Sequence, residues 1–125
     1  MSNLPAYLGE DISIAALIEE TRERAKLGMV LWPNVSELIA NYRRIGKWLS
    51  DLEIRRAIDS GHIMDRHRTK DPVDCWVINL VGLDSEAELL GVTLHLPVHR
   101  TEVLEITEVF FFHPEFQLEV VDKWG

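Results

Sequence analysis

The spacing of apolar residues changes once along this chain, at Gly61, and that change constrains the fold more than any other feature. Before Gly61, apolar residues recur every three or four positions, as in amphipathic helices. After it, they alternate or form unbroken runs rich in Val, Ile and Phe, as in β-strands. The 125 residues, of which 46% are apolar, can bury one sizeable core. We therefore expect a single α+β domain over residues 1–125, helical over 10–61 and β-sheet over 62–121.

Three helices are expected in the first half, because three segments combine an apolar stripe with recognisable ends. They cover residues 14–28, 34–46 and 50–61, and the last of them opens on the capping box Ser50-Asp-Leu-Glu53. Between the first two helices, residues 29–32 form a short apolar run that fits either a strand or an extended linker.

Apolar runs after Gly61 predict a series of strands. They cover residues 62–68, 73–83, 89–96, 103–112 and, as a short last strand, 118–121. The polar connections between the longer runs have hairpin length, so successive strands should pair antiparallel. Pro97 cannot donate a ladder hydrogen bond, so its strand should end there or lie at an edge. The expected fold class is α+β, with two or three N-terminal helices packed on one face of a three- to five-stranded antiparallel meander sheet.

Charge is divided along the chain almost as sharply as periodicity. The formal net charge of −8 opposes a role as a nonspecific nucleic-acid binder. Residues 43–70 hold eight basic and four acidic side chains, a local charge of +4, whereas residues 71–125 hold eleven acidic and two basic ones, a local charge of −9. We therefore expect an electrostatically two-faced molecule.

Signatures of cofactor, metal and common enzyme sites are absent from the sequence. There is no glycine-rich phosphate loop, nucleophile elbow or paired-cysteine motif, and the single cysteine, Cys75, lies in an apolar run that predicts a buried thiol. His95 and His99 have a metal-like spacing, but on a strand they lie about 13 Å apart, too far to share one ion. No apolar run approaches the roughly 20 residues of a membrane span. We expect a cytoplasmic protein with no cofactor, metal or membrane contact.

The segment His62-Ile-Met-Asp-Arg-His-Arg68 has the densest mixture of proton-transfer and cationic groups. His67 could act as a general base while Arg66 and Arg68 bind a phosphate, as catalysis by a metal-independent ribonuclease requires. If the segment is a strand, Asp65 and His67 share one face while Arg66 and Arg68 share the other. The alternative is a solvated edge strand whose charges protect it from aggregation.

Two further groups of charged residues are candidate binding residues. Basic side chains off the apolar stripes of the second and third helices could form an anion-binding patch or be neutralised by nearby acids: Arg43, Arg44, Lys47, Arg55 and Arg56. Arg100 could add a further phosphate contact. Acidic side chains of the second half could form a sheet face that engages a basic protein: Asp84, Glu86, Glu88, Glu102, Glu105 and Glu108.

The order of motifs after residue 52 resembles a known toxin superfamily. Arg56-Ala-Ile-Asp-Ser-Gly-His-Ile is followed by apolar strands at residues 75–82, 89–96 and 103–110. Small bacterial domains of unknown function related to the RelE and MqsR toxins show this pattern: a capped helix ending in Ala-Leu-x-x-Gly-x-Ile, then three consecutive strands. The resemblance implies the same fold and a bacterial or phage setting. It also implies RNA cleavage by basic and histidine side chains on or beside the sheet.

Two functions are therefore open. The first is a non-catalytic protein-binding module of the toxin–antitoxin or immunity type, whose acidic sheet face binds a basic protein or whose partner is a second copy of the chain. The second is a metal-independent ribonuclease toxin that uses His67. Relatives often carry a histidine in the helix before the matched region, whereas residues 36–45 contain none. That difference and the net negative charge favour the first function and make RNA the less expected partner.

Overall fold

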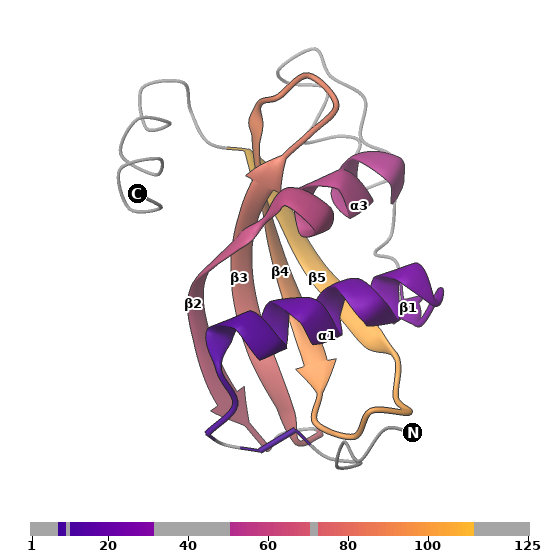
Figure 1. The fold of residues 1–125 in the computed structure, drawn as a ribbon, viewed down its shortest axis with the longest axis vertical. Coiled ribbons are helices and arrows are strands. Elements are labelled where there is room, and N and C mark those ends of the chain that lie inside the picture. Colours follow the sequence, from indigo (N-terminus) through magenta and orange to yellow (C-terminus); the bar gives the residue numbers. More distant parts are fainter. Residues whose placement is uncertain (1–7, 10, 32–50, 71–72, 112–125) are drawn as a thin grey trace.

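A computed structural model describes residues 8–9, 11–31, 51–70 and 73–111 (Figure 1). The elements are α1 (Ile14–Lys26), β1 (Val30–Leu31), α3 (Asp51–Ser60), β2 (His62–Thr69), β3 (Cys75–Leu83), β4 (Leu89–Pro97) and β5 (Leu104–Phe111). The predicted α+β class is confirmed. The predictions of a helix over residues 34–46 and a strand over 118–121 lie outside the described residues.

The sheet has five strands in the order β1-β5-β4-β3-β2. The last four strands form the predicted antiparallel meander, with each strand beside the next one along the chain. The expectation of a wholly antiparallel sheet is wrong at one edge, because β1 pairs with β5 in parallel, Val30 opposite Leu104. Gly28 adopts a φ of 75° directly after α1, and the turn that it allows directs Met29 and β1 along β5.

Local signals in the sequence set the ends of α1. The Ser13 side chain accepts a hydrogen bond from the Ala16 backbone N–H at 3.1 Å, so it acts as the N-cap. At the other end, the backbone N–H groups of Leu27 and Gly28 donate to carbonyls of the last turn. The described boundaries of α1 and α3 agree with those predicted to within two residues.

Both described helices pack on the same face of the sheet, which therefore carries the core (Figure 1). Leu17 of α1 and Ile58 of α3 are fully buried against apolar side chains of β3 and β4, such as Ile78 and its cross-strand neighbour Leu94. The approach of α3 is unusually close at Gly82, where a Cβ atom would lie 1.8 Å from the Ala57 carbonyl oxygen. Neither described helix is long and apolar enough to cross a membrane.

Side chains that alternate with this core point to the opposite side of the sheet, which we call the open face. Strand register places the polar ones in two rows, beside a small apolar cluster of Val81 and Leu89 on the same face. One row runs Asp65, Asn79, Thr93, Glu108, and the other runs His67, Val77, His95, Glu105. No helix among the described elements covers this face.

Candidate functional site

The open face holds proton-transfer groups from three strands, β2, β4 and β5. His67 and His95 lie in one row with Val77 between them, so their backbones are separated by roughly 10 Å, twice the usual strand spacing. Glu105 stands next to His95 on the neighbouring strand. The two rows contain three carboxylates and no lysine or arginine. This surface can exchange protons and attract cations.

Two hydrogen bonds hold the centre of the open face. The Thr93 hydroxyl donates to Oδ1 of Asn79 at 2.7 Å, across the β3–β4 pair. The Thr107 hydroxyl donates to the Thr93 carbonyl at 3.3 Å, where β4 and β5 change register by one residue. The bulge keeps Glu108 on the same side as Thr93, because Val109 after it returns to the core.

A buried thiol lies next to the row that contains His95. Cys75 is 1% exposed, and its Sγ is 3.9 Å from Nδ1 of His95. Burial raises the pKa of the Cys75 thiol, with the carboxylates of Asp74 and Glu105 adding to the effect. The prediction of a buried thiol is confirmed. A protonated thiol in this position is a packing group rather than a nucleophile.

Arg66 and Arg68 lie on the helix side of the sheet, not beside His67, as the alternation along β2 predicts. The Arg66 guanidinium donates to the Ile12 carbonyl at 2.8 Å, which ties β2 to the residues before α1. It also lies over the Trp76 ring, 5.3 Å from the ring centre. The structure therefore does not bring the candidate base and this candidate phosphate ligand together.

Arg68 is held by a forked ion pair. Its Nε and Nη2 atoms donate to the two carboxylate oxygens of Asp74 at 2.9 and 3.1 Å. The hydrogen bond from Arg68 is the main reason why the pKa of Asp74 is lowered. Like Arg66, Arg68 also lies over the Trp76 ring, with its Cζ atom 5.8 Å from the ring centre. Both arginines thus act as structural groups that cover one buried indole.

The acidic residues predicted to form one face are distributed over three places. Glu105 and Glu108 are on the open face. Asp84 is only 6% exposed and accepts backbone N–H groups of Glu86 and Glu88 at 2.8 and 3.0 Å, which closes the β3–β4 turn. Glu102 lies at the opposite end of the sheet, after β4. Only two of the predicted acids therefore share the face with His67 and His95.

The predicted basic patch is described in part. Arg55 and Arg56 are exposed on α3, on the helix side of the molecule. Arg43, Arg44 and Lys47 lie outside the described residues. Within the described ranges, no group of three or more His, Cys, Asp and Glu side chains is arranged to hold a metal ion.

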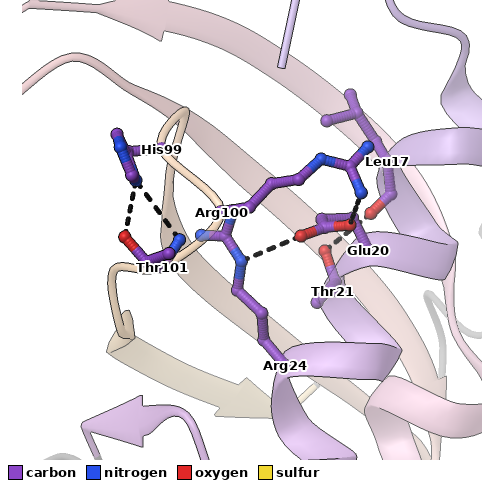
Figure 2. A network of polar contacts seen from close by, with 7 residues as sticks. All are labelled: Leu17, Glu20, Thr21, Arg24, His99, Arg100 and Thr101. Carbon is purple, nitrogen blue, oxygen red and sulfur yellow. Dashed lines mark hydrogen bonds and ion pairs between the residues drawn. The ribbon is translucent and has the colours of Figure 1, made fainter. Parts of the chain in front are cut away.

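A cluster that the sequence interpretation missed joins α1 to the β4–β5 turn. The carboxylate of Glu20 lies between two guanidinium groups, 3.1 Å from Nε of Arg24 and 3.3 Å from Nη1 of Arg100 (Figure 2). The turn itself is fastened by Thr101, whose hydroxyl and backbone N–H both contact Nδ1 of His99, at 2.6 and 3.3 Å. We call Glu20, Arg24 and Arg100 the arginine cluster.

Arg24 is the unusual member of the arginine cluster, because its side chain is 1% exposed. Burial lowers its pKa and Glu20 opposes this effect. A signal was present in the sequence: Arg24 is seven residues after Leu17, on the same stripe of α1 as buried Thr21. A charged residue in an apolar stripe indicates a buried ion pair or a ligand site.

No protein-family model matches the chain, and no curated protein or solved structure matches it significantly.

Proposed function

We propose that this protein is a cytosolic, non-catalytic protein-binding module of the toxin–antitoxin or immunity type, and that its open face binds a basic partner protein. The observation that carries the proposal is the composition of that face, whose two rows hold three carboxylates and no lysine or arginine. Surface carboxylates gathered in this way attract partners of the opposite charge and disfavour polyanions.

The positions of the arginines support binding over catalysis. Cleavage of RNA without a metal needs cations near the base, where the phosphate gains charge in the transition state. Arg66 and Arg68 lie on the other face of the sheet from His67 and already have backbone, carboxylate and indole contacts. A phosphodiester on the open face would therefore meet Asp65, Glu105 and Glu108 instead of cations.

Charge reversal on the open face tests the proposal. The reversed protein carries Glu105→Lys and Glu108→Lys, and the matched control carries Glu86→Lys, an exposed acid in the β3–β4 turn. Each form is used as bait in an extract of the source cell, and any protein recovered by the wild type is purified and titrated. We expect a basic partner whose affinity falls about tenfold or more on double reversal, about 1.4 kcal/mol, and is unchanged in the control. A partner that binds all three proteins equally contradicts the proposal.

Ribonuclease activity remains a second candidate because His67 and His95 share one row of the open face, which could supply both a general base and a general acid. The test is incubation of the purified protein with RNA in the presence of a chelator, compared with His67→Ala. Cleavage that the substitution abolishes would establish the nuclease and overturn the non-catalytic proposal. Cleavage that is unchanged in His67→Ala would contradict a nuclease site that uses His67.

A further inference from the structure

The arginine cluster contains more donors than acceptors. Nη1 and Nη2 of Arg24 and Nε of Arg100 are buried, and none of them has a hydrogen-bond partner within the described part of the chain. A buried guanidinium nitrogen without an acceptor is costly, because it has lost water and gained nothing in return. Glu20 cannot satisfy both arginines, since one of its oxygens is used by each (Figure 2).

The cluster also brings two positive charges to one carboxylate. The guanidinium groups of Arg24 and Arg100 both contact Glu20, and the Glu102 carboxylate acts on Arg24 more weakly. Arg100 is the accessible member, with 26% of its side chain exposed against 1% for Arg24. An anion arriving from solvent would therefore meet Arg100 first.

A groove lies beside the arginine cluster. It has a volume of about 860 Å³ and runs between α1 and α3, with Arg100 at one wall. That volume is in the range of small-molecule sites. Its described charged lining is mixed: Glu19, Glu20, Arg22, Glu23, Lys26, Arg55, Asp59 and Arg100. The Arg22 side chain already donates hydrogen bonds to the carbonyls of Ile58 and Gly61, at 3.2 and 3.0 Å.

We propose that this groove binds a small zwitterionic amino carboxylate, such as a free amino acid, with its carboxylate on Arg100. When the ligand carboxylate pairs with Arg100, both oxygens of Glu20 become available to Arg24. A forked Glu20–Arg24 pair then gives an acceptor to one of the unsatisfied Arg24 nitrogens. The ligand thus improves the hydrogen bonding of the cluster without entering the buried space around Arg24.

The charge of the walls selects a zwitterion over a dianion. Four of the described charged side chains in the lining are acidic and four are basic, so the groove suits a ligand that carries both charges better than a dianion. Glu19, Glu23 and Asp59 would attract an ammonium group attached to the bound carboxylate. L-lysine carries both a carboxylate and ammonium groups, so it is a suitable probe.

Arginine side-chain NMR tests the site directly, because each Nε–Hε group gives its own ¹⁵N–¹H signal. We expect titration with L-lysine to move the signals of Arg24 and Arg100 to saturation, with a Kd of about 1 mM or tighter. L-lysinamide, which lacks the carboxylate, should produce no saturable shift. Inorganic phosphate should bind more weakly than L-lysine. Absence of saturation with L-lysine, equal shifts with L-lysinamide, or tighter binding of phosphate would each overturn the proposal.

Variants separate binding from folding. Arg100→Gln should lower the affinity for L-lysine at least about tenfold. Arg100→Lys should lower that affinity less, because lysine keeps the positive charge but cannot form a forked pair with a carboxylate. Arg56→Gln is the matched control, since Arg56 is exposed on α3 but is not among the described residues that line this groove. Circular dichroism checks that each variant is folded. Unchanged affinity in Arg100→Gln would contradict the assignment, whatever the open face binds.

Discussion

Replacing Glu20 by glutamine probes how far buried Arg24 depends on the carboxylate that it contacts. Glutamine keeps the size of the side chain and one acceptor oxygen but removes the charge that Arg24 and Arg100 share. Arg24 is 1% and Glu20 12% exposed, so solvent cannot replace the lost interaction. Removing one partner of a buried ion pair costs about 3–5 kcal/mol, and the retained oxygen places this variant near the lower end, about 3 kcal/mol.

A loss of that size is easily measured. For a chain of this length it lowers the melting temperature by about 10–15 °C and removes a large part of a typical domain's 5–15 kcal/mol. Urea unfolding followed by tryptophan fluorescence and circular dichroism gives the free energy directly. The matched control is Asp74→Asn, which breaks the Arg68–Asp74 pair, whose side chains are 21% and 39% exposed. That pair should contribute less than the Glu20 pair, because solvent screens it. If Glu20→Gln costs no more than Asp74→Asn, the argument from burial is wrong.

Three further predictions concern packing, pH and reactivity. Gly82→Ala places a Cβ 1.8 Å from the Ala57 carbonyl oxygen, so it should lower the free energy of unfolding in urea by about 3 kcal/mol. Gly28 has open space around it and a φ of 75°, so Gly28→Ala should lower that free energy by about 1 kcal/mol. Equal losses in the two variants would contradict the close approach of α3. Arg68 lowers the pKa of Asp74 from its ordinary value of 3.8. The wild type should therefore be more stable than Asp74→Asn above that pH, and the difference in the free energy of unfolding should shrink as the pH falls through the lowered pKa. A difference that persists in acid would show that the Asp74 carboxylate is not its source. Burial raises the pKa of the Cys75 thiol above its ordinary value of 9.0. Iodoacetamide should therefore alkylate Cys75 at least about tenfold more slowly in the folded protein than in urea at the same pH. Equal alkylation rates, measured by mass spectrometry, would show that the thiol is accessible.

The meander and its helix face were predictable from the sequence, because four long strands and two capped helices each carry their own periodicity. The parallel partner of β5 was not. β1 has only two residues, Val30 and Leu31, and so short a segment shows no period. Its pairing depends on where the turn at Gly28 directs the chain, which is a property of the assembled fold. The local signals in residues 29–32 therefore fitted a strand and a linker equally well.

The candidate sites also depend on contacts that local sequence does not predict. Alternation along β2 correctly separates His67 from Arg66 and Arg68, because the direction of each side chain follows from the strand alone. The partners that occupy those arginines come from elsewhere in the chain: the Ile12 carbonyl and the Trp76 ring. The arginine cluster likewise joins Glu20 and Arg100, which are eighty positions apart. Sequence spacing predicts faces, but it does not predict contacts between distant segments.

Folding also changes the meaning of the charge division in the sequence. The basic stretch before Asp71 does not form one half of the molecule, because β2 sends Arg66 and Arg68 to the helix side and leaves Asp65 and His67 on the open face. Arg100, from the acidic half, returns to the helix side through Glu20. The division between two stretches of sequence is thus lost on the helix side, where acidic and basic side chains are mixed, whereas the two polar rows of the open face hold only carboxylates as charged groups besides histidine. Because charge acts through space, the proposed basic partner would respond to the carboxylates of the open face, although Asp65 and His67 have arginines as neighbours in sequence.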